Sequence, residues 1–107
     1  MAYSEKLAVR IREALRTFDN VEEKKMFGSI GFMVNGKLCV TAGPGRMMCR
    51  IDPVLHNDAK RKDGVEAVLM RGREYKGYFH ISEENLADGS YFKYWLQLAL
   101  DYNKKLI

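Results

Sequence analysis

The sequence predicts an α+β domain: an antiparallel sheet of about five strands, starting with an N-terminal meander, flanked by an N-terminal helix and C-terminal helices. Short apolar segments separated by turn residues run from residue 30 to residue 81, as in a sheet. Apolar residues recur at helical spacing near both ends of the chain. The 107 residues contain no linker, repeat or low-complexity segment, so we expect 1–107 to form a single domain.

The first helix is expected to run from Ser4, a typical N-cap residue, to Phe18. Its apolar side chains recur at a period of 3.6 residues, at Leu7, Ile11, Ala14, Leu15 and Phe18. Asp19-Asn20 then interrupts the pattern. One side of this helix is therefore expected to pack on the core.

A β-hairpin is expected around Asn35-Gly36. A type I′ turn needs positive φ at both central positions, and Asn and Gly adopt it most readily. Large apolar residues alternate before the turn and return after it. A two-residue loop would place Phe32 opposite Cys39 and Met33 opposite Leu38.

The sequence of the central part of the chain predicts a third strand, a short helix and two more strands. The turn 42–46 precedes the strand 47–51, and its glycines lead into no helix with Lys and Ser or Thr, so a plain turn is favoured over a phosphate loop. Asp52 and Pro53 are typical of the start of a helix, which should end near Gly64. Strands are expected at 65–70 and 75–81, joined by the turn 71–73.

Ser82 is expected to cap another short helix, which Gly89 ends, before a last helix from about Ser90 to Lys104. This last helix is apolar around most of its circumference. One stripe is expected to pack on the core and consists of Phe92, Trp95, Leu96 and Ala99. A second stripe consists of Tyr91, Tyr94 and Leu98. Either the sheet of the same domain folds around this second stripe, or a protein partner or a second copy covers it.

The composition is that of a globular protein, with 47% hydrophobic and 30% charged residues. The chain has no apolar run of the length that a membrane span needs and no apolar signal segment at its start, so we expect a cytoplasmic protein without membrane contact. The net charge is +4. Four basic residues of the sheet region could form one anion-binding face: Arg46, Arg50, Arg73 and Lys76. Because Glu66 and Glu74 lie in the same region, a mixed solvent surface is the alternative.

The sequence predicts no catalytic residue, no cofactor and no metal site. We expect His56 to be solvated and His80 to be a structural or surface residue. Cys39 and Cys49 are too few for a zinc site or a disulfide scaffold. They oppose each other if the loop between their strands is 42–46, and lie on opposite faces if it is one residue shorter. The sequence leaves two interpretations of these cysteines open: two thiols buried in the core, or a redox-active pair.

Several segments together resemble a known family. Lys25-Met26-Phe27-Gly28, followed by residues 31–37, is similar to the signature hairpin of the TfoX N-terminal domain, in the TfoX/Sxy competence-regulator family. The other matching segments are Arg50-Ile51-Asp52, Arg71-Gly72-Arg73, Tyr78-Phe79 leading into Ser82-Glu83-Glu84, and the last helix with Trp95 and Leu100. The resemblance covers essentially the whole chain.

The resemblance implies an antiparallel sheet flanked by helices, no known cofactor, and a role in bacterial competence gene expression together with a cyclic-AMP receptor-type activator rather than by catalysis. Ser29 replaces the family's second glycine after Met-Phe-Gly, and Glu83 replaces a frequent proline. Full-length regulators also carry a C-terminal helical domain, which we do not expect here. The fold therefore transfers more directly than the function.

The leading hypothesis is a non-enzymatic cytoplasmic regulatory or protein-interaction domain that binds a protein partner or forms a homodimer. A first alternative is a nucleic-acid-binding module that uses the basic sheet face. A second alternative is a small ligand-binding or enzymatic domain that uses Arg50, Arg73, His80 or the cysteines.

Overall fold

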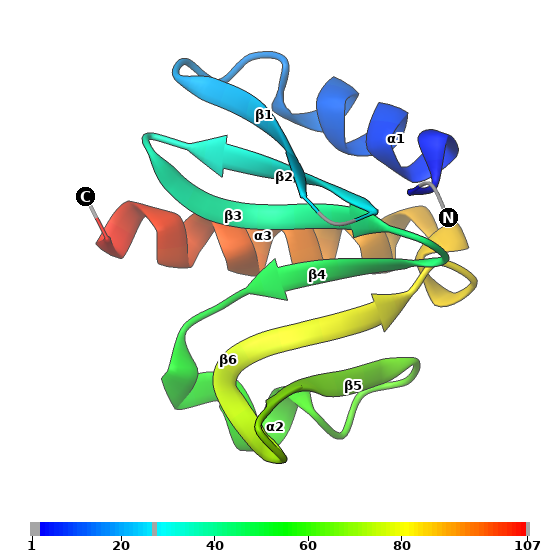
Figure 1. Cartoon of the computed structure of the whole chain (residues 1–107), viewed down its shortest axis with the longest axis vertical. Coiled ribbons are helices and arrows are strands. Elements are labelled where there is room, and N and C mark those ends of the chain that lie inside the picture. Colours follow the sequence, from blue (N-terminus) through cyan, green and yellow to red (C-terminus); the bar gives the residue numbers. More distant parts are fainter. Residues whose placement is uncertain (1–2, 27, 107) are drawn as a thin grey trace.

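A six-stranded antiparallel sheet, with the order β1-β2-β3-β4-β6-β5, packs one face against two long helices (Figure 1). The computed structural model describes residues 3–26 and 28–106. The elements are α1 (Glu5–Leu15), β1 (Val21–Met26), β2 (Ser29–Val34), β3 (Lys37–Gly43), β4 (Arg46–Arg50), the 3-10 turn η1 (Pro53–Leu55), α2 (His56–Ala59), β5 (Val65–Met70), β6 (Arg73–Ser82), the 3-10 turn η2 (Asn85–Ala87) and α3 (Gly89–Lys105). The predicted α+β class is confirmed, with six strands rather than about five.

The strand that the sequence did not predict is β1, which forms one edge of the sheet. Its central residues 22–25 are all charged, so it lacks the apolar alternation of a half-buried strand. Its position explains this, because a strand at an edge can expose most of its side chains. Arg12 of α1 donates to both carboxylate oxygens of Glu23, at 2.6 and 2.8 Å, and so ties the helix to this strand.

The turn between β2 and β3 has the predicted type, since Asn35 and Gly36 have φ of 53° and 78°. Met33 lies opposite Leu38, as predicted. Phe32 lies opposite Val40 rather than Cys39, because the register shifts between Phe32 and Met33 and leaves an extra residue on β3. Phe27 of the family-like Met-Phe-Gly segment lies outside the described residues.

Ser4 caps α1 as expected, and its Oγ accepts a hydrogen bond from the N–H of Leu7 at 3.2 Å. The helix ends at Leu15 rather than Phe18, and both Ala14 and Phe18 are exposed. The chain turns there toward β1 through Asn20, whose φ is 59°. The apolar face of α1 is therefore one turn shorter than predicted, and its large side chains are those of Leu7, Ile11 and Leu15.

Asp52 and Pro53 open a helical segment as predicted, and Oδ1 of Asp52 accepts from the N–H of Val54 at 3.0 Å. The expected helix at Ser82 is wrong. Strand β6 continues to Ser82, whose Oγ accepts from the N–H of Glu84, and only the 3-10 turn η2 follows. Gly89 is the first residue of α3 rather than a break, because Asp88 caps this helix.

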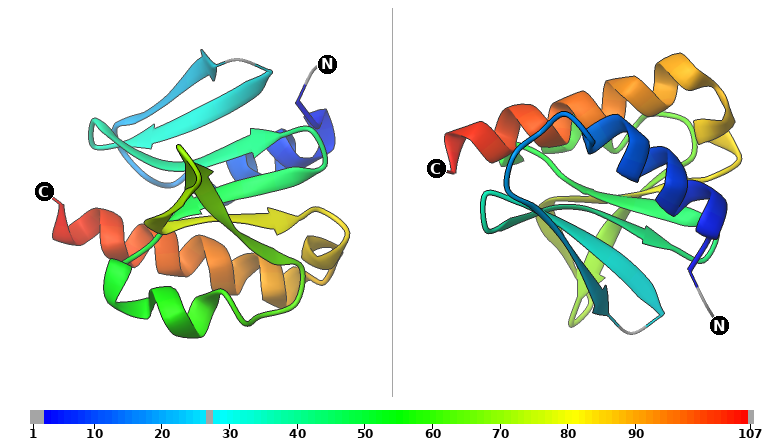
Figure 2. Two further views of the ribbon diagram at one scale, coloured as in Figure 1. Left: turned by 60° about the horizontal axis from the view of Figure 1, so that its bottom comes forward. Right: turned by 90° about the horizontal axis from the view of Figure 1, so that it is seen from above.

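The core lies between the sheet and the helices α1 and α3, which share one face of the sheet (Figure 2). The predicted core stripe of α3 is buried in full: Phe92, Trp95, Leu96 and Ala99. Asn103, near the end of α3, is also buried, and its Nδ2 donates to the carbonyl of Val34 at 3.0 Å. Buried side chains from Phe92 to Asn103 thus hold α3 against the sheet.

We call the other sheet face the open face. Strand register places one row of residues side by side across it, namely Lys24, Gly31, Thr41, Met48, His80 and Glu66. Arg46 of β4 lies on the same face as Met48, since alternate strand residues share a face.

Candidate functional site

The second stripe of α3 is partly covered by the segment between α2 and β5. The hydroxyl of Tyr91 donates to the carbonyl of Asp63 at 2.7 Å, and Nζ of Lys62 lies 5.2 Å from the ring centroid of Tyr94. Tyr91 and Leu98 pack partly buried against the core, whereas Tyr94 is 41% exposed. Contacts within the domain thus cover Tyr91 and Leu98 in part, and Tyr94 is the most accessible residue of this stripe.

The four basic residues of the predicted anion-binding face lie on two neighbouring strands, β4 and β6. Arg46 and Arg50 lie at the two ends of β4, about 13 Å apart at 3.3 Å per residue. Arg73 follows the turn between β5 and β6, and Lys76 lies farther along β6. Among the described residues, none of the four has a carboxylate within salt-bridge distance.

Arg50 belongs to a cluster of tyrosines that the sequence did not predict. Its guanidinium lies 5.6 Å from the ring centroid of Tyr78 and 5.8 Å from that of Tyr102 on α3. Tyr75 stacks on Tyr78 with ring centroids 4.2 Å apart and planes 5° apart. Burial raises the pKa of Tyr78, and the positive charge of Arg50 opposes this shift. We call Arg50, Tyr75, Tyr78 and Tyr102 the Tyr-Arg cluster.

Gly77 explains why Tyr75 and Tyr78 meet. In a regular strand, residues three apart point to opposite faces. Gly77 lies between them with φ of 85°, and β6 carries extra residues relative to β5 at this point. The resulting bulge changes the alternation, so both rings lie on one side. No pattern in the tyrosine spacing alone would have revealed this.

A groove on the open face lies beside β5, with a volume of about 290 Å³. Its polar side chains are Arg46, Glu66 and His80, and residues 67–69 form its apolar wall. Burial, with a smaller effect of the positive charge on Arg46, lowers the pKa of His80. His80 is half-buried, and the structural or surface role expected for it stays a prediction.

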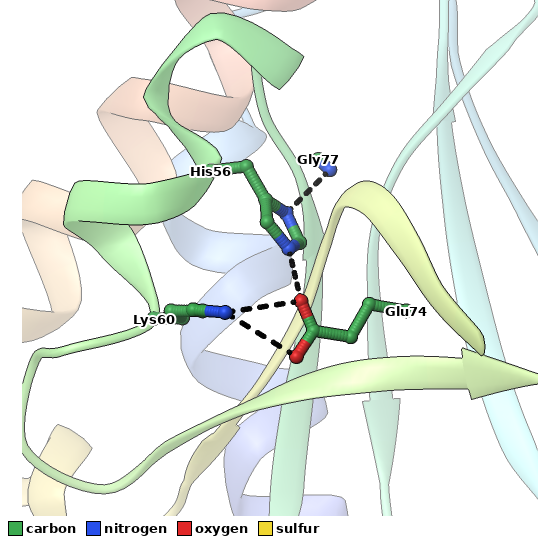
Figure 3. A network of polar contacts seen from close by, with 4 residues as sticks. All are labelled: His56, Lys60, Glu74 and Gly77. Carbon is green, nitrogen blue, oxygen red and sulfur yellow. Dashed lines mark hydrogen bonds and ion pairs between the residues drawn. The ribbon is translucent and has the colours of Figure 1, made fainter. Parts of the chain in front are cut away.

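The prediction of a solvated His56 is wrong, because only 2% of the residue is exposed. Its Nδ1 accepts a hydrogen bond from the backbone N–H of Gly77 at 3.1 Å, and its Nε2 lies 2.8 Å from Oε1 of Glu74 (Figure 3). The ring also packs on Phe79, with centroids 4.8 Å apart. Lys60 pairs with the same carboxylate, and these two partners lower the pKa of Glu74. The side chain holds α2 against β6.

Both cysteines are buried free thiols. The turn between β3 and β4 contains only Pro44-Gly45, and Val40 rather than Cys39 lies opposite Cys49. Burial raises the pKa of Cys39 to about 12 and that of Cys49 well above its usual range. The buried positions and the raised pKa values are those expected of two thiols in the core.

The two edges of the sheet differ in character. Edge strand β1 presents Glu22, Glu23, Lys24 and Lys25 in succession. Edge strand β5 is apolar except for Glu66, and Leu69 and Met70 at its end are 63% and 54% exposed. Strand β5 pairs with β6 alone, and its outer edge makes no hydrogen bond to another segment of the described chain.

Across residues 3–26 and 28–106, no three His, Cys, Asp or Glu side chains are grouped as a metal site would require. None of the helices described has the length and apolarity for a membrane span.

The comparisons with known proteins identify the family. The family model for the TfoX N-terminal domain matches residues 13–102, which include all six strands and most of α3. No curated protein and no solved structure matches the chain. The match extends over far more than half of the 107 residues, as the resemblance of the hairpin and the last helix predicted. The chain belongs to the TfoX N-terminal domain family.

Proposed function

We propose that the domain is a non-enzymatic cytoplasmic regulator of the competence-regulator type, and that it acts by binding another protein at the outer edge of β5. Membership in the TfoX N-terminal domain family supports the regulatory role. We choose the outer edge of β5 as the binding surface because the two edges of the sheet differ in charge and exposure. Strand β1 has four consecutive charges, whereas β5 has one and ends in exposed Leu69 and Met70.

The chemistry of an edge strand explains how such a surface works. Unpaired N–H and C=O groups along an edge can bind an extended segment of a partner as an additional strand. Charged residues on an edge oppose this pairing, and β1 has that protection. Val65, Ala67 and Val68 are only half-buried, so an added strand would also cover apolar side chains of β5.

Tyr91, Tyr94 and Leu98 form the second contact surface of this proposal. The exposed ring of Tyr94 supports it, and the half-buried Leu98 lies one turn farther along the same side of α3. Tyrosine is enriched in protein interfaces because it combines a large apolar ring with a hydroxyl. This surface is suited to a second copy of the chain or to the partner itself.

A site-specific crosslinking experiment tests the role of the β5 edge. A photoreactive benzoylphenylalanine at position 70 should form a protein adduct in the native cell, whereas the same group at position 24 on β1 should form none. Leu69→Lys should reduce the adduct at least tenfold, because a charge at the edge opposes strand addition. Binding of the purified partner, with a cyclic-AMP receptor-type activator as the first candidate, should fall in parallel.

The matched control is Glu22→Lys, which changes the charge of the other edge and should leave the adduct intact. Equal adducts at positions 70 and 24, or an adduct that Leu69→Lys does not change, would contradict the proposal. Because Leu69 is exposed, its replacement should leave the fold intact, and thermal unfolding checks this.

A further inference from the structure

We propose that the Tyr-Arg cluster binds single-stranded nucleic acid, with an unpaired base stacked on Tyr75 and a backbone phosphate bound by Arg50. This inference concerns residues separate from the β5 edge and from the second stripe of α3. It rests on the stacking geometry, on a guanidinium without a carboxylate partner, and on the charges around the cluster.

The ring of Tyr75 is available for stacking. Tyr78 covers one of its faces at a centroid distance of 4.2 Å, yet Tyr75 stays 45% exposed. Stacking of a base on an aromatic side chain contributes to single-strand binding without depending on sequence, since every base has a flat face. The support from Tyr78 holds the ring in place, so little side-chain entropy remains to be lost on binding.

Arg50 is oriented but not neutralised. It lies between the rings of Tyr78 and Tyr102, and no carboxylate of the described residues is within salt-bridge distance of it. Asp52 is the acidic residue closest in sequence, and Lys105 and the N–H of Val54 occupy its carboxylate. The guanidinium N–H groups therefore remain available to phosphate oxygens, which they match in geometry.

The charges next to Tyr75 also favour a polyanion. Arg73 and Lys76 flank it in the sequence and have no carboxylate within salt-bridge distance among the described residues. The carboxylate of Glu74 between them is engaged by His56 and Lys60. The segment next to Tyr75 therefore carries unpaired positive charge, and single-strand binding surfaces combine such charge with aromatic rings.

These features favour a single strand over a duplex. In a duplex the base faces are stacked on one another, so only phosphates would reach the cluster, and the ring of Tyr75 would contribute nothing. The proposal therefore predicts that loss of the ring weakens single-strand binding specifically, and that loss of the charge on Arg50 weakens it with a reduced dependence on salt.

Fluorescence anisotropy with a labelled 12-nucleotide oligothymidine and a 12-base-pair duplex, both at about 50 mM salt, tests the proposal. Tyr75→Ala should weaken single-strand binding about tenfold, and Tyr75→Phe should restore it, because the ring rather than the hydroxyl makes the stack. Arg50→Gln should weaken it to a similar extent and reduce the slope of log K against log salt by about 0.7.

Two matched controls distinguish the cluster from general effects. Phe18→Ala removes an aromatic residue that is 40% exposed elsewhere, and Arg16→Gln removes an exposed charge on another surface. Both should bind as the unchanged chain does. Crosslinking with an oligonucleotide that contains 5-iododeoxyuridine should modify the peptide with Tyr75. Thermal unfolding confirms that every variant folds.

Three results would each overturn the proposal: no binding of oligothymidine at low salt, equal loss in Phe18→Ala and Tyr75→Ala, or duplex binding as tight as single-strand binding. The protein-contact proposal does not depend on this outcome, because Leu69→Lys tests it with a different readout.

Discussion

The backbone N–H of Gly77 donates a hydrogen bond to Nδ1 of His56 at 3.1 Å, so the ring proton of the neutral imidazole lies on Nε2. That proton points to the carboxylate of Glu74, 2.8 Å away. One buried ring thus joins α2 to the bend in β6 that also brings Tyr75 and Tyr78 together. Its contribution is to stability and to the shape of this region.

Replacement of His56 by leucine should lower the free energy of unfolding by about 1–3 kcal/mol. The change keeps an apolar side chain of similar size but leaves the N–H of Gly77 without its acceptor in a buried site. Urea denaturation measures the loss. Glu74→Gln, at an exposed position, serves as the control and should cost clearly less. A His56→Leu chain as stable as the original would show that the hydrogen bond contributes nothing.

Gly77→Ala should destabilise the fold by more than Gly36→Ala. Both glycines have positive φ, 85° and 78°, so both substitutions strain the backbone by about 1 kcal/mol. A Cβ at Gly77 would also lie 2.6 Å from the carbonyl oxygen of Ile51, whereas a Cβ at Gly36 meets nothing within 4 Å. Thermal and urea unfolding of the two variants give the difference, and equal losses would contradict the close contact at Gly77.

The stability of the chain should fall as the pH rises above about 9. An unfolded thiol loses its proton near its usual pKa of 9.0, whereas burial keeps folded Cys39 protonated up to about 12. The unfolded state then binds fewer protons, so each buried thiol lowers the free energy of unfolding by up to about 1.4 kcal/mol per pH unit in this window.

Urea denaturation at pH 8, 9.5 and 10.5 checks this behaviour by comparison with Cys39→Ala, because other groups titrate equally in both chains. The decline should be shallower in the variant. Identical declines would mean that the thiol is accessible in the folded state.

Self-association should depend on Tyr94. If a second copy covers this part of α3, light scattering over a range of protein concentrations should show a dimer, and Tyr94→Glu should shift the equilibrium toward the monomer about tenfold. A carboxylate buried in an apolar interface loses its hydration without gaining a partner. Val9→Glu, on α1 at a residue that is 48% exposed, is the control. A monomer at every concentration would remove self-association from the proposal.

Features that depend on neighbouring residues could be predicted from the sequence. These include the type I′ turn at Asn35-Gly36, the cap at Ser4 and the core stripe of α3 with Trp95. Each follows from the φ that a residue type prefers, from a side chain that reaches the next turn, or from a period of 3.6 residues. The sequence also indicates Arg50 as a candidate anion ligand, since it is a basic residue in the region of the predicted sheet.

The remaining features depend on contacts between distant segments. Strand β1 exists because β2 pairs with it, although its charged residues 22–25 give no strand pattern. His56 is buried because α2 folds onto β6, and Tyr75 meets Tyr78 because Gly77 bends that strand. Sequence alone determined the fold class and the main core positions, because these rest on local periodicity and turn chemistry, and the resemblance of several segments indicated the family. Only the tertiary structure decided which polar and aromatic side chains meet, because that depends on register and bulges, which local patterns do not specify.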